Sequence, residues 1–161
     1  MFGLFKKKSI VNELKAPVDG TVVSVTEAKD DVFSSCMLGK GVVIHPTSGI
    51  LVAPADGEVS VVMEGTNHAI GLKLSNGVDL LLHIGLDTVG LQGKGFQAFA
   101  KMGDKVTTGQ KLIEFDRQII KDNGLCDDVI FIVLDGENVP ATMEYKTGMN
   151  ATAGETIVAS W

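Results

Sequence analysis

The stretch AIGLKLSNGVDLLLHI, residues 69–84, is the part of the sequence that best indicates how the chain folds. Two apolar runs flank the pair Asn76-Gly77, and such a pair between apolar runs is typical of a β-hairpin with a two-residue turn. We therefore expect two antiparallel strands, one over residues 69–75 and one over residues 78–84.

Short runs of β-type residues, separated by turn residues, recur along the rest of the chain, and this pattern is typical of a sandwich or barrel. The run VIFIVL at residues 129–134 is apolar at every position and predicts a strand that is covered on both faces. A short helix is expected over residues 116–122, with Asp116 as its N-cap and Gly124 as its terminator. The remaining strands are expected at residues 21–26, 41–45, 58–63, 111–115, 141–145 and 156–159.

Two pairs of similar segments indicate repeated turn-and-strand units. APVDGTV at residues 16–22 recurs as APADGEV at residues 53–59, and GDKVTTG at 103–109 is weakly similar to GMNATAG at 148–154. We expect an all-β protein, an antiparallel β-sandwich or barrel-like fold with internal hairpin repeats and at most short helical turns. The 161 residues fit one domain. We place it at residues 15–161, after a flexible basic segment at residues 1–14.

The composition restricts the class of protein. Hydrophobic residues make up 45% of the chain and charged residues 21%, as in folded soluble domains. The longest apolar run, residues 129–134, is too short to form a membrane-spanning helix. The formal net charge of −6 argues against a broad nucleic-acid-binding surface, so no nucleic-acid partner is expected. The two cysteines, Cys36 and Cys126, form no CxxC pattern, which favours buried thiols in a reducing, cytoplasmic compartment.

The first residues of the chain differ from the acidic remainder. Residues 1–8 read MFGLFKKK, in which the charge follows the apolar residues, so the segment does not resemble a secretory signal. Two interpretations stay open: a solvated tail, and a weak contact of residues 1–9 with an anionic membrane surface. The second would make the protein peripheral at the inner face of the membrane.

Candidate chemistry is concentrated in the three histidines. His45 ends an expected strand and should be structural or exposed, whereas His83 interrupts an apolar run, where an imidazole without a partner is unfavourable. In the expected register Ser75 pairs with Val78, which makes His68 and His83 diagonal neighbours on one face of the hairpin. A slip of one residue would place the two rings on opposite faces.

Two imidazoles in one pocket are suited to several kinds of chemistry. Neutral imidazole is a nucleophile near neutral pH, and a second imidazole could donate a hydrogen bond to a phosphoryl group carried by the first. The pair could also bind a metal ion, although no third ligand is evident. From the residues alone, a structural role, phosphoryl transfer and metal binding all stay open.

The motifs around His68 and His83 carry a family resemblance. The segments TNHA at residues 66–69 and LHIGLDTV at residues 82–89 closely resemble the glucose-class enzyme IIA domain of the bacterial phosphoenolpyruvate:sugar phosphotransferase system. The resemblance is strong over residues 15–115 and weak in the last third of the chain. Supporting segments lie at residues 16–20, 31–33, 39–41, 44–46, 53–57, 91–96 and 103–106.

The resemblance implies a phosphocarrier that works through a phosphohistidine, with no cofactor. The phosphocarrier protein HPr would deliver a phosphoryl group to Nε2 of His83, and the cysteine of a IIB domain would remove it for sugar uptake. Nδ1 of His83 would donate to the carbonyl of Gly85, His68 would contact the phosphoryl group, and Thr66 would hold the His68 ring. Asp87 would meet basic residues of the partners. An apolar surround that excludes water would be formed by Leu82, Ile84 and Val89.

Three alternatives accompany this interpretation. A regulatory binding module, whose phosphorylation state selects permeases or metabolic enzymes, could coexist with phosphoryl transfer. Zinc at His68 and His83 would need a carboxylate from a partner. The stretch at residues 103–112 resembles a biotinyl or lipoyl carrier, but Asp116-Arg117-Gln118 follows it where the modified lysine would stand. The sequence does not name the sugar, it leaves open a free-standing protein and a part of a larger fusion, and of the oligomeric states it favours a monomer.

Overall fold

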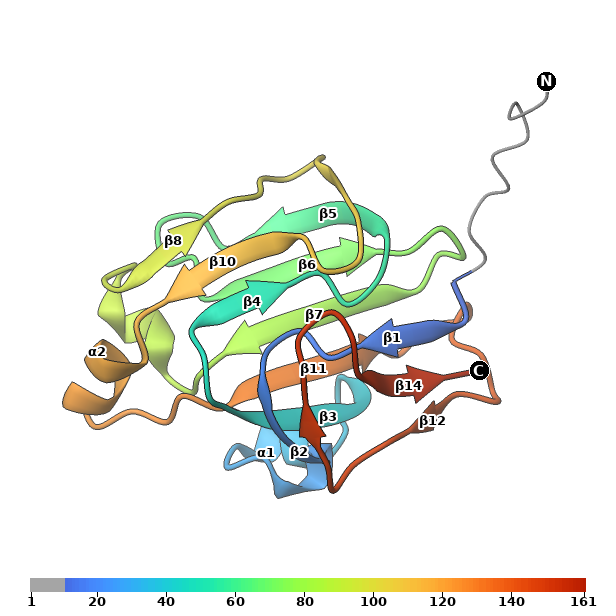
Figure 1. Cartoon of the computed structure of the whole chain (residues 1–161), viewed down its shortest axis with the longest axis horizontal. Coiled ribbons are helices and arrows are strands. Elements are labelled where there is room, and N and C mark those ends of the chain that lie inside the picture. The colour runs from blue at the N-terminus through green and yellow to red at the C-terminus, as the bar shows by residue number, and fades with distance from the viewer. Residues whose placement is uncertain (1–10) are drawn as a thin grey trace.

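Residues 11–161 are described by a computed structural model that consists mainly of antiparallel β-strands (Figure 1). The strands are β1 (Glu13–Lys15), β2 (Gly20–Ser24), β3 (Gly39–Pro46), β4 (Ile50–Val52), β5 (Gly57–Val62), β6 (Ala69–Lys73), β7 (Asp79–Ile84), β8 (Phe96–Ala98), β9 (Lys105–Val106), β10 (Lys111–Phe115), β11 (Val129–Leu134), β12 (Glu144–Tyr145), β13 (Asn150–Ala151) and β14 (Ile157–Ser160). The helical segments are α1 (Asp31–Ser34), α2 (Arg117–Asp122) and the 3-10 turns η2 (Val25–Glu27) and η3 (Thr88–Leu91).

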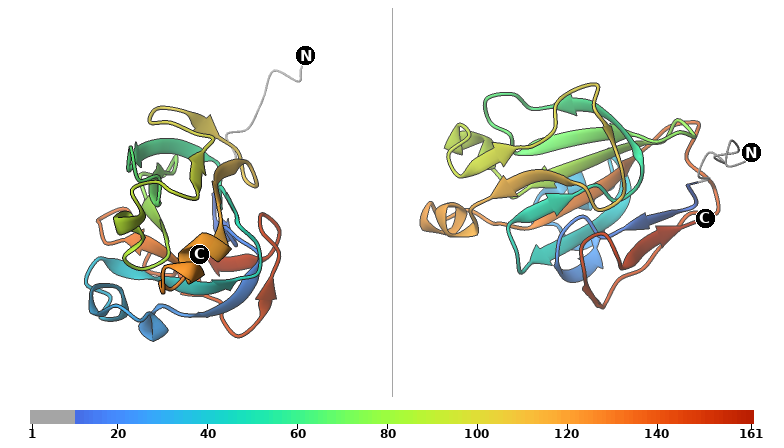
Figure 2. Two further views of the ribbon diagram at one scale, coloured as in Figure 1. Left: turned by 90° about the vertical axis from the view of Figure 1, so that its left-hand side faces the viewer. Right: turned by 45° about the horizontal axis from the view of Figure 1, so that its top comes forward.

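Within residues 11–161, the strands form one large and two small sheets. The large sheet has eight strands in the order β13-β2-β3-β11-β7-β6-β5-β9, and the small sheets have the orders β1-β14-β12 and β4-β10-β8. Buried residues from all three sheets form a single core cluster. The end-on view in Figure 2 shows the strands arranged around this common interior. The expected all-β sandwich or barrel-like fold is confirmed.

Strand β11 is covered on both faces, as its apolar sequence predicts. It lies between β3 and β7 in the large sheet. Val129, Phe131 and Val133 belong to the main core cluster, whereas Ile130 and Ile132 belong to a second cluster on the opposite face. The second cluster includes residues of η2 and α1, so these short segments cover the outer face of the large sheet.

The turn of the β6–β7 hairpin is longer than predicted. The Leu74 N–H donates to the Val78 carbonyl at 2.8 Å, so residues 75–77 form a three-residue loop. Gly77 has a φ of 87°, the left-handed position that such a loop requires. The expected pairing of Ser75 with Val78 is therefore wrong by one residue.

The N-terminal boundary of the folded part lies earlier than expected. Glu13 and Leu14 pair with β14, and Leu14 is fully buried in the core. The expected boundary between residues 14 and 15 therefore falls inside β1, and Glu13 and Leu14 belong to the folded domain.

The expectation of membrane contact concerns residues 1–9, which lie outside the described residues. Within residues 11–161, no helix is both long enough and apolar enough to cross a membrane.

Replacing Leu82 with alanine is expected to lower the free energy of unfolding by about 2–5 kcal/mol. Leu82 is 0% exposed and lies in the main core cluster, so truncation leaves a cavity there. Urea unfolding followed by far-UV circular dichroism measures the change. Met102→Ala is the matched control because Met102 is 69% exposed, and its change should stay within about 0.5 kcal/mol. Equal losses in the two variants would contradict the assignment of Leu82 to the core.

Candidate functional site

His68 and His83 lie next to each other, with ring centroids 4.9 Å apart and an angle of 87° between the ring planes. His83 belongs to β7 and is opposite Ala69 of β6. In this register a regular strand would turn His68 to the other face of the sheet. His68, however, precedes the first residue of β6, and Asn67 before it has a φ of 52°. Because His68 lies outside the regular strand, strand alternation does not separate it from His83.

The two rings lie on the outer face of the large sheet. His83 is opposite Ile130, which belongs to the second core cluster, and the Phe33 ring of α1 lies 5.1 Å from the His83 ring. The expected surround of Leu82 and Ile84 is wrong, because strand alternation turns both into the main core. The apolar contact of His83 therefore comes from Phe33.

Both rings have Nδ1 engaged in a hydrogen bond. Nδ1 of His83 lies 2.8 Å from the Gly85 carbonyl oxygen, which can only accept, so this nitrogen carries a hydrogen. The Thr66 hydroxyl donates to the Met63 carbonyl at 3.1 Å and lies 2.8 Å from Nδ1 of His68. Since the hydroxyl has one hydrogen, Thr66 accepts from Nδ1–H of His68. In each neutral ring, Nε2 therefore carries the lone pair.

The Nε2 atoms of both rings remain accessible to solvent. Within residues 11–161, neither atom has a hydrogen-bond partner, and no side-chain nitrogen or oxygen is both sealed from solvent and without a partner. His68 as a whole is only 5% exposed. The pair is thus a dyad of one buried ring, His68, and one partly buried ring, His83, whose two free nitrogens can be reached from outside.

The surroundings keep both imidazoles neutral near pH 7. Burial, with a smaller contribution from the neighbouring His83, lowers the pKa of His68 from its usual 6.5 to about 4. Burial also lowers the pKa of His83, and this effect is opposed by the Gly85 hydrogen bond and by the charges of Asp30 and Asp87. A neutral ring is the form that can act as a nucleophile.

The chain after His83 turns tightly and presents Asp87 at the surface. Gly85 has a φ of 71°, and a Cβ there would lie 2.4 Å from the Thr88 side chain, so no other residue fits without rearrangement. The buried Thr88 hydroxyl donates to the Ile84 carbonyl. Asp87 precedes η3 but its side chain makes no capping hydrogen bond, and Val89 is 51% exposed.

The structure therefore brings together four of the five site residues expected from the sequence, and the fifth lies at the rim. His68, His83, Thr66 and Gly85 are linked by ring contact and hydrogen bonds, and exposed Asp87 influences His83 electrostatically. The sequence reasoning assigned no role to Phe33 or Asp30. The signal for Asp30 was present, since an aspartate before a helix is a preferred N-cap, and Asp30 accepts from two backbone N–H groups of α1.

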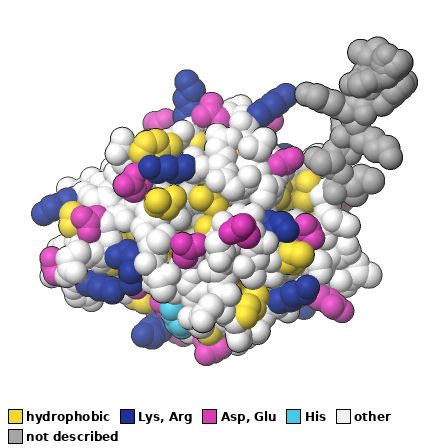
Figure 3. Space-filling view, in the orientation of Figure 1, with side chains coloured by type: hydrophobic (Ala, Val, Ile, Leu, Met, Phe, Trp, Pro, Cys, Tyr) yellow, Lys and Arg dark blue, Asp and Glu magenta, His cyan; other side chains and the backbone are white. Residues whose placement is uncertain are grey.

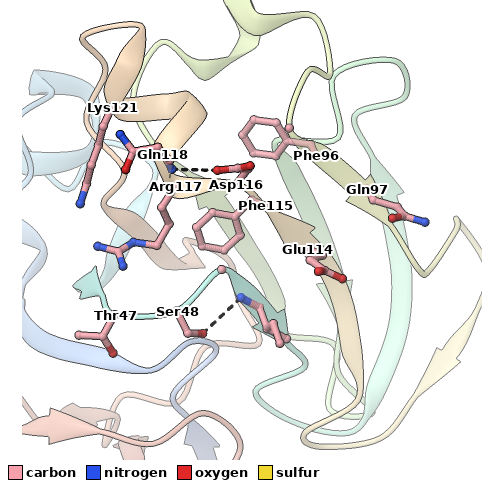
Figure 4. A pocket seen from close by; sticks show the side chains of 13 residues that line it. Thr47, Ser48, Phe96, Gln97, Glu114, Phe115, Asp116, Arg117, Gln118 and Lys121 are labelled. Carbon is pink, nitrogen blue, oxygen red and sulfur yellow. Dashed lines mark hydrogen bonds between the residues drawn. The ribbon is translucent and has the colours of Figure 1, made fainter.

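A cavity of about 780 Å3 lies elsewhere, beside β4, β10 and α2 (Figure 4). Arg117 and Lys121 line it, but Asp127 lies 2.9 Å from Arg117 and 3.8 Å from Lys121 and offsets their charge. None of the expected site residues lines this cavity. Figure 3 shows interspersed acidic and basic side chains on the face drawn there. We therefore place the candidate site at the two histidines.

The described part of the chain offers no complete metal site. Among residues 11–161, no group of three or more histidine, cysteine or acidic side chains is arranged to hold a metal ion. The zinc alternative at His68 and His83 thus still requires a ligand from a partner.

Comparison with known proteins agrees with the geometry of the site. Residues 12–139 match the family described as phosphoenolpyruvate-dependent sugar phosphotransferase system, EIIA 1. The PTS system glucose-specific EIIA component of Bacillus anthracis is 39% identical over 158 residues, which cover 98% of this chain and 94% of the relative. A glucose-specific EIICBA component of Staphylococcus carnosus is 46% identical over 108 residues, 67% of this chain and 16% of that protein.

A solved structure supports the same relationship. The glucose permease IIA from Mycoplasma capricolum superposes with a TM-score of 0.78 and 34% sequence identity, covering 91% of this chain and 93% of that one. The chain therefore belongs to the EIIA 1 family of the phosphoenolpyruvate-dependent sugar phosphotransferase system, and it is a phosphotransferase component that carries phosphoryl groups in sugar uptake.

Proposed function

We propose that Nε2 of His83 is the atom that accepts the phosphoryl group from phospho-HPr and passes it to the cysteine of a IIB domain. The observation that carries this proposal is the pair of neutral rings in edge-to-face contact. In both rings Nδ1 is bonded and Nε2 is free and accessible. The fused EIICBA relative joins an EIIA part to EIIB and EIIC parts in one name, which supports a IIB domain as the acceptor.

Each transfer exchanges one bond to phosphorus for another. In the first step the bond from phosphorus to the donor histidine of HPr breaks, and a bond from phosphorus to Nε2 of His83 forms. In the second step this new bond breaks, and a bond from phosphorus to the IIB cysteine sulfur forms. Nδ1–H of His83 stays on the Gly85 carbonyl throughout, so the ring does not have to change tautomer.

His68 is proposed to stabilise the phosphoryl group. Its neutral Nε2 has no hydrogen to donate, but an anionic phosphoryl group beside the ring favours the protonated form. Nε2–H of the protonated ring would then donate to a phosphoryl oxygen, while Nδ1–H remains on Thr66. Because phosphoryl transfer proceeds through a loose transition state, such positioning and charge stabilisation supply most of the catalysis.

The rim of the site is proposed as the contact surface for both partners. Asp87 is exposed and its carboxylate makes no helix-capping bond, so it is available to basic partner residues. Val89, which is half-exposed, lies two residues after Asp87, in η3.

We assign the site to one phosphocarrier domain that begins at β1.

The proposed acceptor atom can be identified directly. Incubation with enzyme I, HPr and labelled phosphoenolpyruvate, followed by mapping of the modified residue, should place the label on His83. The linkage should be labile in acid and stable in base, as phosphoramidates are. A label mapped to His68 or to another residue would contradict the proposal.

The pH dependence of the site follows from the lowered pKa values. His68 should take up a proton only as the pH falls toward about 4. Between about pH 6.5 and pH 4 the unfolded chain binds more protons than the folded protein, so stability should fall as the pH drops through this range. Nitrogen-15 NMR of the imidazole rings measures the titration, and a midpoint for His68 at 6.5 or above would contradict the expectation.

Phosphorylation is expected to reverse part of this effect. The charge of the phosphoryl group should raise the pKa of His68 above its value of about 4 in the unmodified protein. The same titration, repeated on the phosphorylated protein, tests the proposed contact. An unchanged midpoint would show that His68 does not approach the phosphoryl group.

Two finer parts of the proposal rest on the sequence. Phosphorylation state could select regulatory targets through the same rim. Residues 1–9 would add weak contact with an anionic membrane surface, since apolar residues there stand beside three lysines. Co-sedimentation with anionic vesicles should then decrease when residues 1–9 are removed, and equal pelleting of both forms would count against the contact.

A further inference from the structure

His45 and Asp128 form a partly buried, hydrogen-bonded pair beside the histidine dyad. Nδ1 of His45 lies 2.7 Å from a carboxylate oxygen of Asp128, whose side chain is only 8% exposed. A buried carboxylate is unfavourable unless it is paired and hydrogen-bonded. Within residues 11–161, the Asp128 carboxylate is hydrogen-bonded to His45, and the Cys126 thiol also interacts with Asp128.

The pair lies on the same face of the sheet as the dyad. His45 is two residues from Val43 on β3, and Val43 is opposite Ile130, which is opposite His83. Because side chains alternate along strands, His45 shares a face with Val43. Asp128 directly precedes β11, and its hydrogen bond to His45 places its side chain on this face.

Backbone hydrogen bonds connect the Asp128 segment to the group that holds His83. The Gly85 N–H donates to the Asp128 carbonyl at 2.7 Å, and the Leu86 N–H donates to the Cys126 carbonyl at 3.1 Å. The Gly85 carbonyl and the Leu86 N–H belong to one trans peptide and point in opposite directions. The hydrogen bond from the Leu86 N–H to the Cys126 carbonyl therefore fixes the orientation of this peptide. In that orientation the Gly85 carbonyl oxygen points toward Nδ1 of His83 and accepts its hydrogen bond.

We propose that His45 and Asp128 are positioning residues for His83. The buried Asp128 side chain, held by His45 on β3, fixes residues 126–128. This segment in turn fixes the Gly85 carbonyl that keeps the hydrogen on Nδ1 and the lone pair on Nε2. The inference rests on the proposed role of His83, and it adds a second pair of residues that never touches the phosphoryl group.

Two substitutions of His45 separate positioning from general packing. His45→Leu removes the donor, whereas His45→Asn places an amide donor where Nδ1 stands. His45→Leu should reduce the rate constant of phosphoryl acceptance by about tenfold without changing the KM for phospho-HPr. Nitrogen-15 NMR should show a smaller fraction of His83 with its hydrogen on Nδ1. His45→Asn should recover most of both quantities.

Glu114→Gln is the matched control. Glu114 also makes a charged contact, with Lys111 at 2.6 Å, but it lies on β10 in the separate β4-β10-β8 sheet. This variant should keep the parental rate and His83 tautomer. A parental rate and tautomer in His45→Leu, or equal losses in His45→Leu and Glu114→Gln, would overturn the positioning role. His83→Ala, assayed in parallel, tests the proposed function separately, since label on that variant would overturn both proposals.

Discussion

Replacing His83 with alanine is expected to abolish acceptance of the phosphoryl group from phospho-HPr, a decrease of about 10³-fold or more. The substitution removes the only proposed nucleophilic atom, Nε2. The variant keeps His68, whose ring is held by Thr66. We do not expect His68 to replace His83 as the acceptor, because its burial and lowered pKa suit it to stabilise the phosphoryl group. Labelling with phosphoenolpyruvate, enzyme I and HPr, followed by acrylamide gel electrophoresis under basic conditions, measures the loss.

The fold of the His83→Ala variant must be verified because the His83 ring contacts Phe33 and His68. His83 is only partly buried, so a modest loss of stability and a native far-UV spectrum are expected. His83→Gln fills more of the same space without a nucleophilic imidazole and should be equally inactive. Phosphoryl label retained at the parental level by either folded variant would rule out His83 as the acceptor.

The longer elements of the fold could be predicted because each contains enough residues to show a full hydrophobic or capping pattern. Strands β10 and β11 have the predicted bounds, and α2 begins after the predicted cap at Asp116. Strands β1, β4, β8, β9 and β13, of two or three residues, were missed. Such short segments contain no full hydrophobic period, and their pairing depends on distant strands.

The register of the β6–β7 hairpin shows what a local motif cannot determine. A glycine at positive φ suits both a two-residue turn and the third position of a three-residue loop, and Gly77 occupies the latter. The predicted register was wrong, but the two histidines are adjacent as predicted. They are adjacent because His68 lies just before β6, where strand alternation does not fix the direction of its side chain.

The supports of the site were only partly predictable. Side chains alternate between the two faces of a strand. If His83 faces outward, its neighbours Leu82 and Ile84 must face the core, so their orientation could have been predicted. The contact between Gly85 and Asp128, by contrast, arises from the pairing of β7 with β11. The two residues are far apart in the sequence, and no local pattern identifies a backbone carbonyl as a support.

Replacing His68 with glutamine is expected to separate the two transfer steps. Acceptance should fall by less than about tenfold, because His83 keeps the Gly85 hydrogen bond that leaves the lone pair on Nε2. Onward donation to the IIB cysteine should fall by about 10²–10³-fold, the usual effect of removing one donor to a developing charge. Glutamine can donate a hydrogen bond, but it cannot take up the proton that the phosphoryl charge stabilises on an imidazole.

Rapid-quench measurements of each half-reaction, with phospho-HPr as the donor and a IIB domain as the acceptor, test this separation. Thr66→Val provides a graded comparison, since it leaves the His68 imidazole but removes the hydroxyl that accepts from Nδ1–H. Its donation rate should lie between those of the parent and His68→Gln. If His68→Gln slows acceptance as much as donation, His68 acts by holding the His83 ring in place, because a group that only stabilises the departing phosphoryl charge would leave the first step nearly intact.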